Sequence, residues 1–465
     1  MFVEALKRHV SITKSKNFYP RTYQEHGIKF IVDNLCAGLF LAPGLGKTAI
    51  VLHAFKILKQ KRKVSKILVV SKLRIIFGVW PVEVKKWGLS FSVGMLHGPK
   101  KEIVLREKHD IYLINYEGLF WLFKQDKYLN MFDMLIIDES SKMKNTSTKR
   151  FKLIKKYLSN FKRRIILTGS PAPNSLEDIF GQIYILDQGK TLGKYITKFR
   201  TDYFMPYGYM GYQWKIIPGQ EKVIYEKIKP LVLRYGHDTV DLPPLHKVII
   251  SVTLDKKSMQ KYRAMEKEFI IELQNGENIL AINAASASSK MRQITGGHIY
   301  NESKKVYFIH DEKIEYLAEL IDELQGSPVL IAYEFNHELN SLLKKFPNAE
   351  YIGKGVNVEK GNQIQHRWNR GEVPILLGQT SALSHGLNLQ GGPCRDVAFY
   401  TLTWNLEDYE QFIQRVWRSG QKESVTVHHI IAEKTIDELV LSVLYKKDKV
   451  QKNLLDAMRA HYLRQ

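Results

Sequence analysis

The chain has 465 residues, of which 44% are hydrophobic and 25% charged, and its formal net charge is +23 at pH 7. These values are typical of a soluble globular protein with two or three domains and exclude a membrane-spanning one, because no apolar run reaches the ~18 residues of a span. Its two cysteines, Cys36 and Cys394, exclude a disulfide framework and a cysteine zinc site. The positive charge favours a polyanionic partner, with nucleic acid ahead of a membrane surface, although a merely basic soluble protein has the same balance.

The first half of the chain alternates short apolar runs with helical patterns. Strands are expected over residues 39–41, 67–70, 111–114, 134–137 and 165–167, with helices between them, for example over 48–58 and 149–157. Such alternation predicts a parallel sheet covered by helices. The pattern loosens after about residue 180, and we expect a helical insertion near 180–240.

The second half repeats the arrangement. Leu242-Pro243-Pro244 interrupts the chain, a strand is expected over 248–252, and a helical insertion follows near 256–300. Further strands are expected over residues 329–332, 349–352, 375–377, 397–400 and 425–431, followed by a basic helix near 436–455. The sequence therefore predicts an α/β fold with two tandem parallel-sheet lobes, residues 1–240 and 241–465.

The stretch from Ala42 to Thr48, Ala-Pro-Gly-Leu-Gly-Lys-Thr, follows the first expected strand and opens the first helix. Glycines let backbone N–H groups close around phosphate oxygens, and the N-terminus of a helix favours an anion. Lys47 would reach the β/γ-phosphates, and the Thr48 hydroxyl would hold Mg²⁺. Leu41 stands where the longer phosphate-loop pattern has its first glycine, so the alternative is a helix cap with an ordinary lysine.

Two adjacent acids, Asp138 and Glu139, end the expected strand over 134–137. This position puts them at the carboxyl edge of the sheet, beside the phosphate loop. Asp138 can hold Mg²⁺, and Glu139 can orient and deprotonate the attacking water. The alternative is a strand end capped by solvated acids.

Arg415 and Arg418 lie three residues apart, so on a helix they would share one face. Guanidinium groups suit the charge that develops on a transferring phosphoryl group. If these arginines complete the site, nucleotide binds between the two lobes and hydrolysis moves one lobe against the other. The alternative is an ordinary basic helix face.

Further short motifs follow one another in a specific order. They are Arg21 with Tyr23-Gln24, the segment 80–87 (Trp-Pro-Val-Glu-Val-Lys-Lys-Trp), Asn115-Tyr116-Glu117, 138–145, 167–174 (Leu-Thr-Gly-Ser-Pro-Ala-Pro-Asn), Leu242-Pro243-Pro244, Met291-Arg292-Gln293-Ile294, 386–389 (Gly-Leu-Asn-Leu) and 411–421. Together with the phosphate loop they resemble the Swi/Snf-type ATPases of helicase superfamily two, which have two RecA-like lobes. The resemblance covers nearly the whole chain.

The resemblance implies an enzyme that hydrolyses ATP with Mg²⁺ and binds DNA. It implies a nucleotide site formed by Arg21, Gln24, Pro43, Gly44, Leu45, Gly46, Lys47, Thr48, Gly386 and Gln411, with Lys47, Asp138, Glu139, Arg415 and Arg418 catalytic and Thr48 and Asp138 holding Mg²⁺. The implied DNA contacts are Ser71, Lys72, Asn115, Tyr116, Thr168, Ser170, Asn388 and Trp404. Trp404 is equally well explained as a packing residue.

The chain departs from the family pattern at several positions. Ala42-Pro43 stand where the family usually has an acidic lead-in, and Ser140-Ser141 replace Ala/Gly-His after the two acids. That histidine normally links the nucleotide site to the motif at 167–174, which couples hydrolysis to DNA contact. Ser384-His385 and Leu406 also differ. None of these changes removes a group that hydrolysis needs.

Residues 140–164 contain ten lysines and arginines and no acid, so the run can neutralise phosphates, unless it is a solvated face. No base-reading signature is visible, and we expect backbone contacts without sequence specificity. The leading hypothesis is a translocase on duplex DNA. The alternatives are a strand-separating helicase and a non-hydrolysing scaffold, and RNA is a less favoured substrate.

The sequence shows neither a zinc module nor a long regulatory tail, and its first residues lack the apolar core of a signal peptide. We therefore expect a compact bacterial or bacteriophage factor of replication, recombination or repair. Such a protein would be cytoplasmic, or nuclear if the source is eukaryotic.

Overall fold

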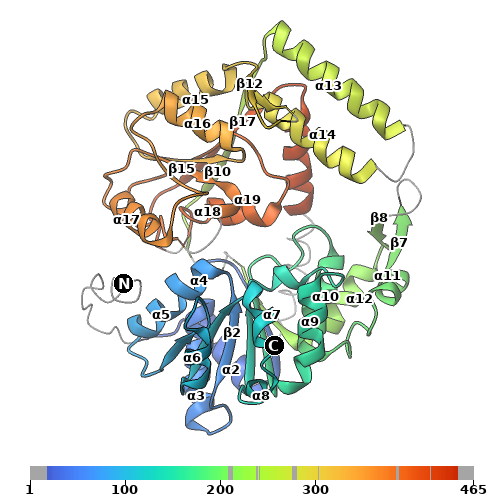
Figure 1. Ribbon diagram of the computed structural model, residues 1–465, viewed down its shortest axis with the longest axis vertical. Coiled ribbons are helices and arrows are strands. Elements are labelled where there is room, and N and C mark those ends of the chain that lie inside the picture. The colour runs from blue at the N-terminus through green and yellow to red at the C-terminus, as the bar shows by residue number, and fades with distance from the viewer. Residues whose placement is uncertain are drawn as a thin grey trace. The chain divides into compact units, whose positions relative to one another are not determined.

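The computed structural model describes residues 18–207, 213–236, 239, 241–274, 280–301, 303–383, 387–418 and 420–448. The chain separates near residue 240 into two compact units, each built around its own sheet (Figure 1). Among the described residues, no helix is long and apolar enough to cross a membrane.

The sheet of the first unit has seven strands in the order β3-β4-β2-β5-β6-β1-β9, and every pairing is parallel. The strands are β1 (Cys36–Leu41), β2 (Ile67–Ser71), β3 (Val93–Met95), β4 (Ile111–Asn115), β5 (Met134–Asp138), β6 (Arg163–Thr168) and β9 (Val232–Tyr235). The central strands are continuous apolar runs because both faces of the sheet are buried. The two edge strands, β3 and β9, are too short for their sequences to have indicated them.

Helices connect these strands. They are α2 (Thr22–Asp33), α3 (Lys47–Gln60), α4 (Leu73–Gly78), α5 (Trp80–Lys86), α6 (Lys101–Arg106), α7 (Leu119–Leu122), α8 (Asp126–Leu129), α9 (Lys149–Tyr157), α10 (Ile179–Asp187), α11 (Ile196–Tyr203) and α12 (Gln220–Ile228). All nine residues of α10 are buried, which is expected of a helix that is apolar all round. The stretch near 180–240 also contains an antiparallel hairpin, β7 (Phe204–Tyr207) with β8 (Gln213–Ile216), and strand β9 of the main sheet.

The sheet of the second unit has six parallel strands in the order β10-β17-β16-β13-β15-β14. They are β10 (Leu245–Val252), β13 (Val329–Tyr333), β14 (Glu350–Ile352), β15 (Ile375–Gln379), β16 (Asp396–Phe399) and β17 (Val425–Ala432). The prediction of two tandem parallel-sheet lobes is therefore confirmed. Both sheets have the parallel pairing that strand–helix alternation predicts.

The helices of the second unit include two that precede its core. These two are α13 (Lys256–Gln274) and α14 (Leu280–Thr295), and the others are α15 (Glu312–Glu323), α16 (Asn336–Lys345), α17 (Val358–Asn369), α18 (Thr380–Leu383) and α19 (Leu406–Ile413). A small hairpin, β11 (His298–Tyr300) with β12 (Val306–Phe308), follows α14. The last helix is described over residues 436–448, and the rest of the expected C-terminal helix lies outside the described residues.

Candidate nucleotide site and the carboxyl edges of the two sheets

The phosphate loop joins the end of β1 to the start of α3. Gly44 and Gly46 have φ angles of 85° and 78°, which lie in the left-handed region that favours glycine. A Cβ atom added to Gly46 would lie 2.8 Å from Nε2 of Gln24. Glycine is therefore favoured at this turn, and the first backbone amides of the 14-residue helix α3 point towards the loop end, where a helix favours an anion.

The side chains around the loop support its conformation. Nζ of Lys47 donates to the carbonyl oxygen of Leu41 at 2.8 Å, and Nε2 of Gln24 donates to that of Leu45 at 3.3 Å. The backbone N–H of Arg21 donates to Oε1 of Gln24 at 3.0 Å. The structure thus brings the segment that resembles an adenine-reading motif into direct contact with the phosphate loop.

Asp138 ends strand β5 and is buried. Its Oδ2 accepts hydrogen bonds from the indole Nε1 of Trp80 at 3.1 Å and from the hydroxyl of Ser71 at 3.3 Å. Burial and, to a smaller extent, the neighbouring Glu139 raise the pKa of Asp138 to about 6, although Trp80 and Lys47 oppose this rise. A buried carboxylate near a lysine, with the Thr48 hydroxyl on the adjacent loop, supplies the oxygen donors that Mg²⁺ prefers.

Glu139 has φ 59° and ψ 57°, a left-handed conformation that is rare for a residue other than glycine. The hydroxyl of Tyr116 donates to the carbonyl oxygen of Asp138 at 2.6 Å and to that of Glu139 at 3.0 Å. Strained backbone conformations of this kind persist where surrounding contacts hold them, and they concentrate at functional sites. Tyr116 therefore fixes the turn that presents the two acids.

The residues expected to contact DNA in the first unit follow parallel strands and so share one edge of the sheet. The hydroxyl of Ser71 is bonded to Asp138, and the hydroxyl of Thr168 accepts from the N–H of Ser170 at 3.1 Å. Nδ2 of Asn115 donates to Oε2 of Glu117 at 2.8 Å, and Lys72 directly precedes α4. All of these expected contacts except Lys72 are buried, namely Ser71, Asn115, Tyr116, Thr168 and Ser170, so they organise the edge, and a direct DNA contact remains a prediction.

The basic run over 140–164 serves more than one purpose, because two of its arginines bind backbone groups of the protein itself. The guanidinium of Arg163 donates to the carbonyl oxygens of Ile31, Val32 and Asn34, and so caps the end of α2. Arg164 likewise binds three backbone carbonyl oxygens. These two arginines stabilise the fold because each saturates backbone groups that would otherwise lack partners.

In the second unit, the expectation that Arg415 and Arg418 share a helix face is wrong, because α19 ends at Ile413. Beyond it the chain continues in turns, with the N–H of Arg415 bonded to the carbonyl of Phe412 at 3.0 Å. The Arg415 guanidinium accounts for this ending, since it binds the carbonyl oxygens of Gln411 at 2.9 Å and Leu387 at 2.8 Å.

Arg418 connects two of the motifs. Its guanidinium donates to Oδ1 of Asn388 at 2.5 Å, and the N–H of Leu389 donates to the carbonyl of Arg415 at 3.1 Å. Gln411 is buried and donates from Nε2 to Oε1 of Glu407 at 3.1 Å. Gly386, expected at the nucleotide, lies outside the described residues.

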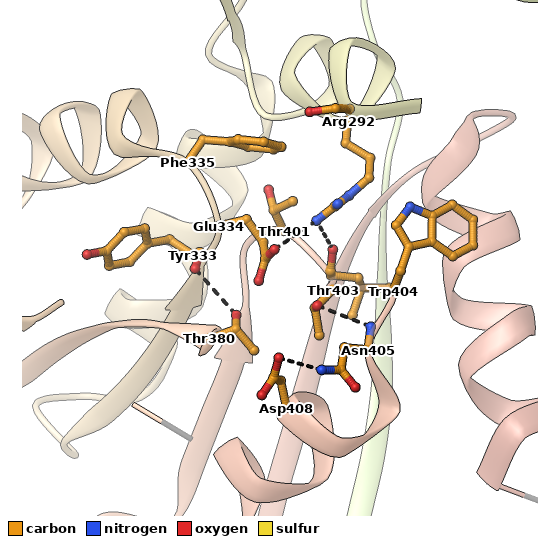
Figure 2. A network of polar contacts seen from close by, with 12 residues as sticks. Arg292, Tyr333, Glu334, Phe335, Thr380, Thr401, Thr403, Trp404, Asn405 and Asp408 are labelled. Atoms are coloured by element: carbon orange, nitrogen blue, oxygen red, sulfur yellow. Dashed lines mark hydrogen bonds and ion pairs between the residues drawn. The ribbon is translucent and has the colours of Figure 1, made fainter. Parts of the chain in front are cut away.

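The carboxyl edge of the second sheet carries a polar network around Glu334 (Figure 2). Arg292 of α14 lies 3.3 Å from a Glu334 oxygen and 5.4 Å above the ring of Phe335. Burial raises the pKa of Glu334 to about 7, and Arg292 opposes that shift. The neighbouring Glu338 accepts the hydroxyl of Thr401 at 2.6 Å. The acids of this edge are thus bound to groups of the same unit.

Trp404 belongs to the same region. Its indole N–H donates to the hydroxyl of Ser288 at 3.1 Å, and its carbonyl accepts from Nζ of Lys447 at 3.0 Å. The indole therefore joins helix α14 to the segment that follows β16 and has a packing role. A contact between the exposed part of Trp404 and DNA stays a prediction.

Trp80 is the residue of the first site that sequence reasoning missed. Trp80 belongs to the segment 80–87, which was noted for the family motif that it resembles. No sequence pattern indicated that its indole would donate to Asp138, 58 residues further along the chain. A buried tryptophan N–H needs an acceptor, and this requirement was the one available signal.

Comparison with known proteins places both units among characterised families. Residues 23–302 match the model of the SNF2-related domain, and residues 312–420 match that of the helicase conserved C-terminal domain. "Putative protein p41" of Acyrthosiphon pisum secondary endosymbiont phage 1 is 33% identical over 96% of this chain and 99% of its own length. The DNA repair and recombination protein RAD54B of Homo sapiens is 24% identical over 91% of this chain and 53% of its own length.

The chain spans between 32% and 67% of several other curated relatives, so they are larger proteins. A solved structure, the Sulfolobus solfataricus SWI2/SNF2 ATPase core in complex with dsDNA, aligns over 96% of this chain and 95% of that chain. That alignment has 21% sequence identity and a TM-score of 0.44.

Proposed function

Because the chain belongs to the SNF2-related, Swi/Snf-type family of helicase superfamily two, whose members hydrolyse ATP, we propose that it couples this hydrolysis to movement along duplex DNA. The ATP hydrolase activity follows from the family. The DNA substrate and the movement are the proposal. The main structural support for the proposal is the nucleotide site. There the glycine loop contacts Gln24, and it lies at the same edge of the sheet as the buried Asp138 and the strained Glu139.

The first unit would hold the nucleotide through its own residues. Backbone N–H groups of residues 44–48 would bind the phosphates next to Pro43, Arg21 and Gln24 would meet the adenine, and Lys47 would neutralise the β/γ-phosphates. Thr48 and Asp138 would hold Mg²⁺, which screens the phosphate charge when it is bound.

Glu139 would accept a proton from the attacking water, since it directly follows Asp138 in a left-handed turn that Tyr116 holds in place. From the second unit, Arg415 and Arg418 would stabilise the negative charge of the transferring phosphoryl group. Gly386 and Gln411 would contact the nucleotide beside them.

DNA would bind at the strand ends named above, Ser71, Lys72, Asn115, Tyr116, Thr168 and Ser170 in the first unit and Asn388 and Trp404 in the second. Contacts through these residues and nearby lysines would be to the backbone, so we expect binding without sequence specificity and with a steep dependence on salt.

A strand-separating helicase is the second candidate, because the first unit carries the β7–β8 hairpin, in which Met205 and Tyr207 are exposed. An exposed aromatic on a projecting hairpin can stack on an unpaired base. Residues 208–212, between β7 and β8 in the sequence, lie outside the described residues.

The test is the ATPase rate with single-stranded, duplex and forked DNA and with RNA, at two salt concentrations. We expect the largest stimulation by duplex DNA, decreasing at the higher salt, and loss of hydrolysis in Glu139→Gln. Displacement of a third strand from a triplex without unwinding of a fork would support translocation, and the reverse would support the helicase. Hydrolysis by Glu139→Gln at the wild-type rate would contradict the assignment of the base.

We further propose a role in replication, recombination or repair of DNA, in a bacterial cytoplasm or a phage-infected cell. This proposal is supported by the phage relative, which the chain matches over nearly its whole length, and by the name of the human repair protein.

A further inference from the structure

A buried polar bridge leads from the catalytic acids to the loop after β6. Ser140, which follows Glu139, is fully buried, and its hydroxyl donates to Oε1 of Gln182 at 2.8 Å. Nε2 of Gln182 donates in turn to the carbonyl of Pro171 at 2.5 Å and to that of Asp178 at 2.9 Å. One fully buried amide thus connects the turn after the acids with the loop over 169–174.

Helix α10, which carries Gln182, lies against both segments. A Cβ added to Gly181 would lie 2.8 Å from the carbonyl oxygen of Lys144 and closer still to that of Met143. Because backbone touches backbone here, a displacement of the 140–144 turn must displace α10 as well. The helix is buried along its whole length and can transmit such a displacement without bending.

A second bridge runs beside the first. Nζ of Lys144 lies 3.4 Å from Oδ2 of Asp178, and the same oxygen accepts the N–H of Asn174 at 2.9 Å. The loop over 169–174 also approaches the phosphate loop, since a Cβ on Gly169 would lie 2.8 Å from Cδ of Pro43. The loop is therefore connected to the nucleotide side at both of its ends.

We propose that Gln182 is a positioning residue that couples the nucleotide state at Glu139 to the loop over 169–174, with Ser140 as its partner. The Ser140–Gln182 pair lies directly after Asp138 and Glu139, at the position where Ser140-Ser141 depart from the pattern that the sequence otherwise resembles. The inference rests on the proposed DNA-dependent activity, since the loop contains Ser170 and follows Thr168, two of the expected DNA contacts.

A polar bridge suits this task because it is directional. Hydrogen bonds depend on the distance and angle between donor and acceptor, so moving one of these buried groups changes the hydrogen bonds of the next. Apolar packing in the same place would tolerate a small slide of one segment against the other. A buried amide needs partners wherever it lies, and what points to coupling here is that the partners of Gln182 belong to two separate segments, the turn at Ser140 and the loop at Pro171.

The experiment measures ATPase rates with and without duplex DNA in Ser140→Ala, Gln182→Leu and the double variant. The matched control is Asp187→Asn, a buried polar residue at the other end of α10 that caps the turn over 189–191 and has no contact with Pro171. We expect the DNA-free rates to stay within about 2-fold of wild type, and the stimulation by DNA to fall about 10-fold in Gln182→Leu. We also expect the double variant to lose no more than Gln182→Leu alone, as for residues in one pathway.

Several results would overturn the inference. They are full stimulation in a folded Gln182→Leu protein, an equal loss in Asp187→Asn, or parallel losses of the DNA-free and DNA-stimulated rates. If Gln182→Leu does not fold, Ser140→Ala decides, since it removes one hydroxyl and leaves the amide in place. A wild-type protein that DNA does not stimulate would instead contradict the proposed function.

Discussion

The carboxyl edges of the two sheets are built alike, and each buries a carboxyl group. Asp138 in the first unit and Glu334 in the second both follow or end a central strand, and burial raises the pKa of each, to about 6 and about 7. Both lie beside a hydroxyl, that of Ser71 at the end of β2 in one case and that of Thr380, the first residue of α18 after β15, in the other. The backbone arrangement alone would not distinguish their roles.

Their partners do distinguish them. Asp138 accepts hydrogen bonds from the neutral indole of Trp80 and the hydroxyl of Ser71, and the charge of Lys47 lowers its pKa, whereas Glu334 has the guanidinium of Arg292 at 3.3 Å. Lys47 belongs to the phosphate loop, which we expect to bind ATP, whereas Arg292 belongs to helix α14 of the same unit as Glu334. We therefore expect the first edge to perform chemistry and the second to hold its unit together.

Lys47→Ala should give the largest effect and should leave stability almost unchanged. Removing the ammonium group takes away charge stabilisation of the phosphates, and the loss of one such donor lowers kcat by ~100-fold or more. Steady-state ATPase assays and thermal unfolding measure the two quantities. A variant that retained its activity, or that lost activity only by unfolding, would remove the basis for assigning chemistry to this edge.

Much of this first edge was predictable from sequence. Continuous apolar runs marked the central strands, and the order of strand, glycine loop, lysine and helix located Gly46 and Lys47, because each of these signals is local. The bond from Trp80 to Asp138 was not predictable, since it depends on how α5 packs on the sheet.

The second unit shows the limits of a spacing argument. The interval between Arg415 and Arg418 fits a helix, but helix α19 already ends at Ile413. The guanidinium of Arg415 instead makes a tertiary contact with the carbonyl oxygen of Leu387. Likewise, the charge of Arg163 suggested a phosphate contact, although its guanidinium caps α2. Charge and spacing are visible in a sequence, whereas the backbone carbonyl that satisfies an arginine is not.

Arg292→Ala should have the opposite consequence to Lys47→Ala. Removing one partner of a buried ion pair leaves Glu334 uncompensated and lowers the free energy of unfolding by about 3 kcal/mol. Denaturant unfolding measures the loss, and the ATPase rate of the folded fraction should change by less than about 2-fold, a factor far below the loss expected for Lys47→Ala. A stable Arg292→Ala protein with greatly reduced hydrolysis would show that the second edge also takes part in the chemistry.

Trp80→Phe tests how much the neutral donors of the first edge matter. The variant loses one hydrogen bond to a carboxylate, so the Mg²⁺ concentration that gives half-maximal ATPase activity should rise about 10-fold. Trp87→Phe is the matched control, because the indole of Trp87 donates to Glu83 at 2.6 Å and has no hydrogen bond with Asp138. An equal shift in both variants would mean that the effect comes from packing and not from the bond to Asp138.

Glu334→Gln should give the smallest effect, and it appears only as a function of pH. The folded-state pKa of about 7 lies above the ordinary value of 4.5, so between these values the folded protein keeps a proton that the unfolded chain has released. The contribution of Glu334 to stability is therefore greatest below pH 4.5 and is lost as the pH rises towards 7. Between pH 6 and pH 7 wild type should lose about 1 kcal/mol relative to Glu334→Gln.

Denaturant unfolding of both proteins at several pH values isolates this difference, because the other titrating groups, including the nearby Glu338, are common to the two. Arg292 opposes the rise in the pKa of Glu334, so its strength as a partner determines how large this pH dependence is. Parallel stability curves would mean that Arg292 neutralises Glu334 completely. The two edges would then differ more than the two pKa values indicate. Glu334 and Arg292 would form a complete ion pair in the second unit, whereas Asp138 in the first unit could still bind a cation.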